Sequence, residues 1–311
     1  MNTAGKIGLF GAALAATFTG AYALGTATEP LTDKTGTAQH AAHTEGEVAP
    51  NKAALPRGLQ VSQDGYTLDL QTPRMTAGQE APLRFAIKDD AGKAVTEYTQ
   101  AHDKELHLIV ASRDLNTFRH LHPTRAADGT WSTPVNLPSA GDYRVFADFT
   151  PAKKGATALT LGTDLAASGS YQPRELPAQQ ATAEVDGYTV TLDGALAAGK
   201  TSALRLIVAK DGKPVTDLDP YLGAYGHLVA LRAGDLAYLH VHPEGEPGDG
   251  TTKPGPGISF MATAPTNGAY RLFLDFKHQG TVRTAAFTVH ATAATAATDS
   301  PSAHNDHSEG H

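Results

Sequence analysis

A histidine pattern occurs twice in this sequence with the same spacing, His-x12-His-x-His-Pro. The first copy consists of His107, His120 and His122, and the second copy consists of His227, His240 and His242. The residues between the histidines differ in the two copies, so chance is a poor explanation for the shared spacing. Because imidazole nitrogens are good ligands for transition metals, we interpret the pattern as a duplicated metal site.

Each copy is typical of a β-hairpin: an apolar run, a polar turn and a second apolar run. In the second copy the turn signal is Ala-Gly-Asp at 233–235. A two-residue turn there places His227 opposite His242, and alternation along the strand puts His240 and His242 on one face. Opposed residues have Cβ atoms roughly 4.5–5.5 Å apart. Three imidazoles can then reach one ion through bonds of about 2.0–2.1 Å.

A structural role for these histidines is the alternative. Ile109 and Phe118 share the predicted face of His107, and Val229 and Tyr238 share that of His227. Histidines among such apolar neighbours can simply form hydrogen bonds with backbone groups at the end of a core.

Two carboxylates occupy equivalent places in the repeat. Asp148 and Asp275 each lie in an otherwise apolar strand, within 143–149 and 270–276. Such a carboxylate can face solvent, pair with a neighbouring arginine, bind a metal, or accept an imidazole N–H and orient the ring. Glu97 and Asp217 also align and are weaker candidates.

The composition narrows the choice of metal. The chain has no cysteine and three methionines, which excludes disulfides, thiolate sites and a methionine-rich Cu(I) site. Imidazole ligands suit Cu(II) and Zn(II), and Cu(II) binds more tightly at equal ligands. His102 and His278 have no histidine counterpart in the other copy, so we leave them outside the predicted site.

Many short alternating strands with turn signals, in two similar series, predict an all-β protein. Asp64-Gly-Tyr-Thr at the start of the first series matches Asp186-Gly-Tyr-Thr in the second. We expect two tandem immunoglobulin-like antiparallel β-sandwich domains, at 57–170 and 182–290, joined by a proline-containing linker at 171–181.

The two ends of the chain predict where the protein is located. Residues 1–28 are an apolar stretch after Lys6, expected to be a signal peptide or a signal anchor. Residues 29–56 and the histidine-containing tail at 291–311 are expected to be disordered. The protein is therefore expected outside the cytoplasm, secreted or anchored, with membrane contact only through its N-terminal segment. A net charge of −7 argues against nucleic acid as a partner.

The histidine hairpins in exported immunoglobulin-like units resemble those of uncharacterised secreted actinobacterial proteins. They are also loosely similar to the extracytoplasmic copper-binding sandwiches of the CopC and YtkA-like kind. The resemblance implies the fold and a role in copper handling. CopC-type sites use a histidine at the mature N-terminus. The N-terminus predicted here after cleavage has no histidine at its start, so the CopC ligand set is not carried over.

The main prediction is a non-enzymatic, exported protein that stores, buffers or delivers copper or zinc, with one histidine cluster in each domain. A membrane metal transporter is a candidate partner. An envelope scaffold or adhesion protein without metal is the alternative. A cupin-like enzyme fits poorly because no glutamate follows His122 at the required spacing, and a superoxide-dismutase-like enzyme fits poorly because no disulfide can form.

Overall fold

The computed structural model describes residues 56–239 and 241–293, and for His242 it describes the backbone alone. The predicted leader, the predicted spacer except its last residue, His240 and most of the predicted tail lie outside these residues. Strand β21 continues to Ala293. The prediction that a disordered tail begins at residue 291 is therefore wrong by three residues. No helix among the described residues is long and apolar enough to cross a membrane.

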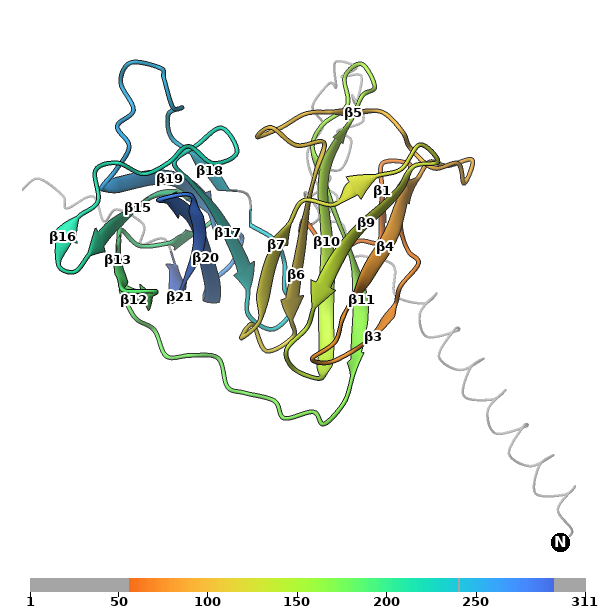
Figure 1. Cartoon of the computed structure of the whole chain (residues 1–311), viewed down its shortest axis with the longest axis horizontal. Helices are drawn as coiled ribbons and strands as arrows, with labels where there is room; N and C mark the ends of the chain where they lie inside the picture. Colours follow the sequence, from red (N-terminus) through yellow and green to blue (C-terminus); the bar gives the residue numbers. More distant parts are fainter. Residues whose placement is uncertain (1–55, 240, 294–311) are drawn as a thin grey trace, which may run out of the picture. The chain divides into compact units, whose positions relative to one another are not determined.

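The first sandwich consists of two sheets (Figure 1). One sheet has the order β1-β2-β4-β9-β8, and the other has the order β3-β11-β10-β6-β7 with β5 added to β10. The strand bounds are β1 Ser62–Gln63, β2 Tyr66–Leu70, β3 Arg74–Thr76, β4 Glu80–Lys88, β5 Tyr98–Thr99, β6 Leu106–Ser112, β7 Phe118–Leu121, β8 Thr124–Arg125, β9 Thr130–Asn136, β10 Gly141–Pro151 and β11 Leu159–Ser168.

The second sandwich repeats this plan. Its sheets have the orders β12-β13-β15-β19-β18, with β16 added to β15, and β14-β21-β20-β17. The strand bounds are β12 Thr182–Val185, β13 Tyr188–Asp193, β14 Ala197–Ala198, β15 Thr201–Lys210, β16 Lys213–Pro214, β17 Gly226–Arg232, β18 Val241–Pro243, β19 Gly257–Thr263, β20 Gly268–His278 and β21 Thr281–Ala293. The predicted fold class, two tandem immunoglobulin-like sandwiches, is confirmed.

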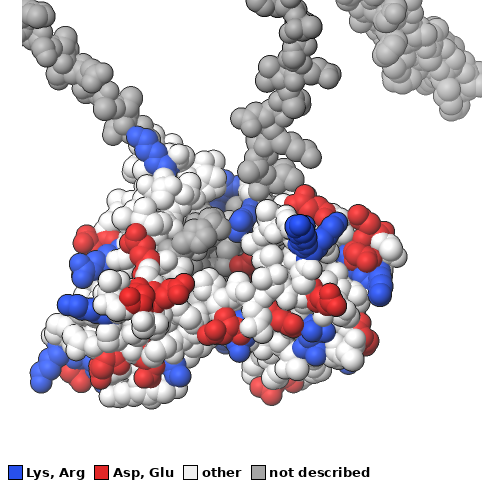
Figure 2. All heavy atoms as spheres, turned by 90° about the horizontal axis from the view of Figure 1, so that it is seen from above, with Lys and Arg blue, Asp and Glu red and all other residues white. Residues whose placement is uncertain are grey.

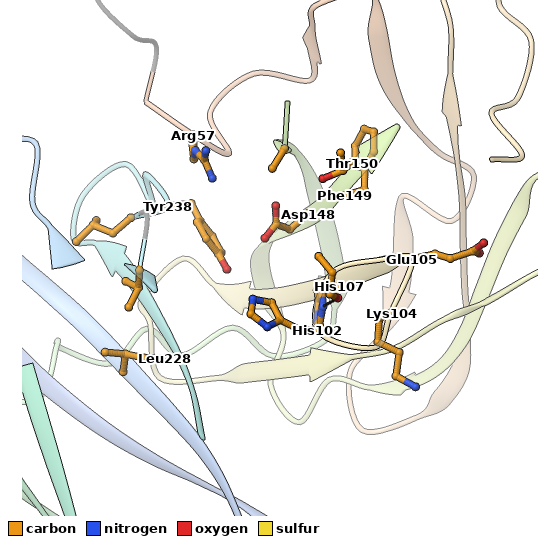
Figure 3. Close-up of a pocket in the computed structure, with 14 residues that line it drawn as sticks. Arg57, His102, Lys104, Glu105, His107, Asp148, Phe149, Thr150, Leu228 and Tyr238 are labelled. Carbon is orange, nitrogen blue, oxygen red and sulfur yellow. Dashed lines mark hydrogen bonds between the residues drawn. The ribbon is translucent and has the colours of Figure 1, made fainter. Parts of the chain in front are cut away.

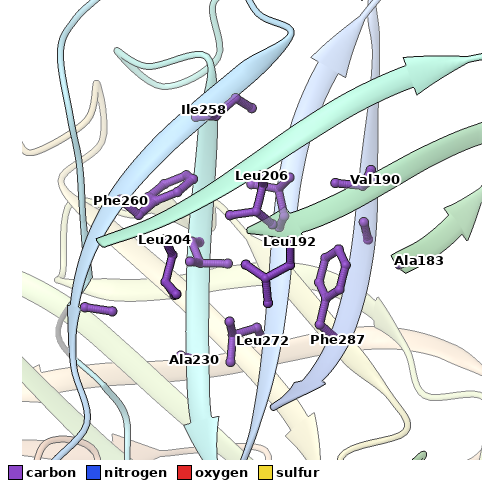
Figure 4. Close-up of a cluster of buried hydrophobic side chains, with 14 of the residues drawn as sticks. Ala183, Val190, Leu192, Leu204, Leu206, Ala230, Ile258, Phe260, Leu272 and Phe287 are labelled. Carbon is purple, nitrogen blue, oxygen red and sulfur yellow. The ribbon is translucent and has the colours of Figure 1, made fainter. Parts of the chain in front are cut away.

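Alternating side chains build a separate core in each sandwich. In the second sandwich, Leu206, Phe260 and Phe287 from three different strands meet between the two sheets (Figure 4). A tyrosine holds the same corner in both repeats: the Tyr143 hydroxyl donates to the carbonyl oxygen of Ser139 at 2.7 Å, and the Tyr270 hydroxyl donates to that of Thr266 at 2.8 Å. Such a tyrosine corner is typical of immunoglobulin-like sandwiches.

Two details differ from the predicted antiparallel sandwiches and their histidine hairpins. Short edge strands pair in parallel, β3 with β11 and β14 with β21. The second histidine hairpin keeps the predicted register only near its turn, where Leu231 faces Tyr238. Residues 241–243 then pair with β19 of the opposite sheet, so the prediction that His242 lies opposite His227 on a continuous hairpin is wrong. The chain changes sheets here to complete the sandwich, as it does in the first repeat between β7 and β8.

A third apolar cluster joins the two sandwiches. It consists of side chains on the outer faces of β6, β10, β17 and β20 and in the adjoining turns, including Ile109, Phe146, Val229 and Leu231. At its centre the rings of Phe118 and Phe273 stack with centroids 4.1 Å apart. The face that carries the histidines is therefore not an inner core face, because it packs against the other sandwich.

The molecular surface carries both signs of charge. On the face shown in Figure 2, acidic and basic side chains are interspersed over both sandwiches. On this face, the distribution gives no support to a large basic surface of the kind that binds nucleic acid.

Candidate metal centre

Three histidines of the first copy meet at the edge of the apolar interface. His107 lies on β6, His120 lies near the end of β7, and His122 follows that strand by one residue. Each offers one ring nitrogen, and these three nitrogens all lie within 4.8 Å of one another. His107 is 8% exposed, and the side chain of His120 is 5% exposed. The hairpin thus brings the three predicted residues together, although His122 lies beyond the strand on which we expected it.

The hydrogen bonds of these rings assign their protons. His107 Nε2 lies 3.1 Å from the carbonyl oxygen of Ala101, and His120 Nδ1 lies 2.7 Å from a carboxylate oxygen of Asp275. Because both partners are acceptors, each of these nitrogens carries a proton. The remaining nitrogens, His107 Nδ1 and His120 Nε2, face each other at 3.1 Å. In neutral rings these two atoms present lone pairs to each other, an arrangement that needs a proton or a metal cation between them.

The third ring adds an unpartnered nitrogen. His122 Nε2 is buried and has no hydrogen-bond partner among the described residues. The ring centroids of the three histidines are 5.3, 5.2 and 4.9 Å apart. Imidazoles that share one tetrahedral ion at bonds of about 2.0–2.1 Å have centroids roughly 5 Å apart. The residues therefore fit a three-histidine metal site.

Asp275 supports this site from the other sandwich. Its second carboxylate oxygen accepts a hydrogen bond from the Thr284 hydroxyl at 2.5 Å, and the residue is 3% exposed. A carboxylate that accepts the outer N–H of a ligating histidine fixes the orientation of the ring. In this structure the predicted carboxylate of the second repeat thus contacts a histidine of the first.

Asp148 holds the equivalent place in the first sandwich, and no described histidine forms a hydrogen bond with it. It faces His107 across β10 and β6, as Asp275 faces His227 across β20 and β17. The Thr160 hydroxyl donates to its carboxylate at 3.1 Å. Burial raises the pKa of Asp148 above its ordinary value.

Of the second copy, His227 alone has a described side chain. It mirrors His107, since its Nε2 lies 3.0 Å from the carbonyl oxygens of both Tyr221 and Leu222. Its ring centroid is 6.3 Å from that of His107. The predicted roles of His240 and of the His242 side chain fall outside the described residues. His227 of the second copy thus lies at the same interface as the triad of the first copy.

His102 was missed by the sequence comparison because the second repeat has Leu222 in its place. It lies in a turn at 101–104 with a φ of 51°, and its ring centroid is 5.0 Å from that of His227 and 6.1 Å from that of His107. A pocket beside the triad is lined by His102, His107, Asp148 and Tyr238, whose side chains point into it (Figure 3). The sequence contains one signal for this residue: the turn of the first repeat has a histidine, and the equivalent turn of the second repeat does not.

Burial and neighbouring imidazoles keep the histidines neutral. Burial, followed by His120, lowers the pKa of His107 to about 3, and the same causes lower the pKa of His122 to about 4. Burial, followed by His102, lowers the pKa of His227 to about 4. Neutral imidazole is the form that binds a metal, so these rings need not lose a proton at neutral pH.

Asp217, a weaker candidate, lies elsewhere in the second sandwich. Its carboxylate lies 3.1 Å from His278 Nε2, while His278 Nδ1 lies 2.7 Å from the Tyr188 hydroxyl. His278 is 5% exposed and both its ring nitrogens have partners. This arrangement is that of a structural histidine.

Fold and site together define a two-domain, immunoglobulin-like protein with a histidine cluster between its sandwiches. The chain belongs to the family described as a domain of unknown function, DUF8832, whose model matches twice, at residues 60–162 and 183–293. The comparison with curated proteins finds no match.

Several solved structures have a similar fold. The Escherichia coli adhesin FdeC is 17% identical, with 75% of this chain and 65% of that chain covered and a TM-score of 0.24. The Yersinia pseudotuberculosis adhesin InvE is 13% identical, with 74% and 60% covered and a TM-score of 0.21. Domains 4–9 of the surface layer protein SbsC are 12% identical, with 75% and 32% covered and a TM-score of 0.23. This chain spans less than two thirds of each of these structures, and at such TM-scores the likeness has no bearing on function.

Proposed function

We propose that this is an exported metal-binding protein whose triad, His107, His120 and His122, holds one divalent transition-metal ion. The observation that supports this proposal most is the 3.1 Å approach of His107 Nδ1 to His120 Nε2. The opposite nitrogen of each ring faces an acceptor, so both lone pairs point to the same place. Two lone pairs that face each other repel, whereas a cation placed between them and the unpartnered His122 Nε2 would be bound by all three nitrogens.

The donor set favours copper and accommodates zinc. Three neutral imidazoles suit Cu(II) and Zn(II), and the order of divalent affinities places Cu(II) first at equal ligands. Three protein ligands leave a coordination position for a further ligand, which suits exchange with a partner. We propose storage, buffering or delivery at the cell envelope rather than turnover, with a membrane metal transporter as the candidate partner. The apolar segment at 7–28 supports placement outside the cytoplasm.

A structural role is the second candidate, and one contact favours it. The hydrogen bond between His120 and Asp275 joins side chains of the two sandwiches, both nearly inaccessible to solvent. In a structural role, the histidine cluster stabilises the pairing of the two sandwiches in an envelope scaffold and needs no metal. A protonated His120 between Asp275 and His107 satisfies the same hydrogen bonds.

Titration of the full chain with Cu(II) and Zn(II), followed by calorimetry, separates the two roles. We compare the wild-type chain with His122→Ala, because Nε2 of this histidine forms no hydrogen bond with the described residues and its loss should disturb the fold little. His278→Gln is the matched control, since it alters a buried histidine outside the cluster. The metal role predicts that His122→Ala loses one tight ion and His278→Gln loses none. Equal uptake by all three proteins refutes the metal role and leaves the scaffold.

A further inference from the structure

The interface contains a second group of potential ligands, contributed by both sandwiches. His102 belongs to the first sandwich and His227 to the second, and their ring centroids are 5.0 Å apart. This separation is close to those within the triad, and it again matches the roughly 5 Å expected for two imidazoles on one ion. We infer that His102 and His227 form a second cation position beside the triad, with Asp148 supplying the negative charge.

The free nitrogens of the two rings support this position. His227 directs Nε2 to the carbonyl oxygens of Tyr221 and Leu222, so Nε2 carries the proton and Nδ1 the lone pair. His102 has no hydrogen bond from either ring nitrogen to another described residue, and the residue is exposed. One ligand is therefore fixed inside the interface and the other is accessible to an arriving ion.

The cavity between these residues contains a suitable countercharge. A cavity of about 70 Å³ is lined by His102, His107, His120, Asp148 and His227, together with apolar residues and Tyr238. Among the described residues that line it, Asp148 carries the one carboxylate. A divalent ion in this cavity would stabilise the charged form of Asp148, whose hydrogen-bond partner among the described residues is the Thr160 hydroxyl.

The backbone of the first repeat is strained where it presents His102. Residue 102 has a φ of 51°, and Leu222 at the equivalent turn has a φ of 56°. Such left-handed conformations are costly for residues other than glycine and occur often at functional sites. The turns of the two repeats also lie close together, since a Cβ atom on Gly223 would lie 3.9 Å from the Cα atom of His102. The repeats share this turn, but only the first places an imidazole there.

The two positions lie next to each other. His107, a triad member, has its ring centroid 6.1 Å from that of His102 and 6.3 Å from that of His227. An ion held by His102 and His227 would thus be separated from the triad site by the imidazole ring of His107. This inference rests on the proposed metal chemistry of the interface, and it adds a place where an ion is first bound before it reaches the buried triad.

Electron paramagnetic resonance of the Cu(II)-loaded full chain tests the second position. Two Cu(II) ions so close couple magnetically and give a half-field absorption. We compare wild type with His102→Leu, which reproduces the residue of the other repeat at the same backbone conformation, and with His122→Ala. Histidines outside the described residues are identical in all three proteins, so differences report the interface.

We expect the half-field absorption in wild type and its loss in both variants, with each variant binding one Cu(II) fewer. If His122→Ala loses one ion while His102→Leu matches wild type in stoichiometry and spectrum, the triad stands and the second position is refuted. If neither variant changes either measurement, the proposed function fails as well. Far-ultraviolet circular dichroism confirms that each variant is folded.

Discussion

His120 Nδ1 lies 2.7 Å from a carboxylate oxygen of Asp275, and the two residues come from different sandwiches. Both side chains are nearly buried, with exposures of 5% and 4%. The contact connects a candidate metal ligand to the packing of the two domains. Binding at the triad and association of the sandwiches should therefore change together when this pair is altered.

Replacing Asp275 by asparagine tests that connection. Asparagine keeps the shape but removes the negative charge that holds the His120 ring, so we expect metal affinity to fall about 10–100-fold. Disturbing this buried hydrogen bond should also cost about 1–3 kcal/mol of unfolding free energy. Competition with a metal chelator measures the affinity, and urea denaturation measures the stability. The control is Asp164→Asn, whose side chain is 82% exposed and pairs with Arg144; an equal loss of metal affinity in that variant would contradict the role of Asp275.

Replacing His122 by alanine should separate binding from stability. Because His122 Nε2 has no hydrogen-bond partner among the described residues, its removal breaks no polar contact of that atom. We expect the loss of a ligand to reduce the affinity of the triad for metal by more than about 100-fold. This exceeds the usual effect of losing a residue that only hydrogen-bonds to a metal ligand. The melting temperature of the metal-free protein should change little.

His278→Gln should show the reverse behaviour. Both ring nitrogens of His278 have partners, Tyr188 and Asp217, so the substitution should destabilise the fold by about 1–3 kcal/mol while metal affinity stays at the wild-type value. A stability loss in His122→Ala as large as that in His278→Gln would argue for a structural role of the triad.

The apolar contact beneath the cluster gives a separate prediction. Phe118, 9% exposed, stacks on Phe273 across the interface. Truncation of a buried phenylalanine costs about 3–5 kcal/mol, so Phe118→Ala should lower stability by that amount and also weaken metal binding, because His120 lies two residues further along β7. Denaturation and chelator competition at low temperature measure both effects.

Phe85 provides the matched control for that prediction. It is fully buried in the core of the first sandwich, where it stacks on Trp131 away from the interface. Phe85→Ala should therefore reduce stability by a similar amount and leave the metal affinity of the folded protein unchanged. Equal losses of affinity in both variants would show that the interface has no special part in binding.

The sequence predicted the sandwiches well because their patterns are local. Alternating apolar residues and Gly-containing turns specify strands. The repeat predicted equivalent places for Asp148 and Asp275, and the structure pairs these residues equivalently, with His107 and His227. The spacing also brought His107, His120 and His122 together. These features depend on period and register within one hairpin or sheet.

The relation between the sandwiches could not be predicted in the same way. The contact of His120 with Asp275 depends on how two outer faces pack, and neither periodicity nor spacing carries that information. His102 was overlooked because the comparison of repeats favours residues that occur in both. A site formed between two similar domains can depend on residues at which they differ.

The pH dependence of stability follows from the same burial. The pKa of His107 is lowered to about 3 and that of His227 to about 4, against an ordinary value of 6.5. The unfolded chain therefore binds these protons first, and metal-free stability should be full above pH 7 and fall as the pH decreases from 6.5 toward 4. Each residue should contribute a loss of roughly 2 kcal/mol by pH 5. Urea denaturation between pH 5 and 7.5 measures the slope, which His227→Gln should reduce. A stability that rises toward pH 5 would mean that these rings are protonated in the folded protein, and the three-imidazole site would then lack its neutral ligands.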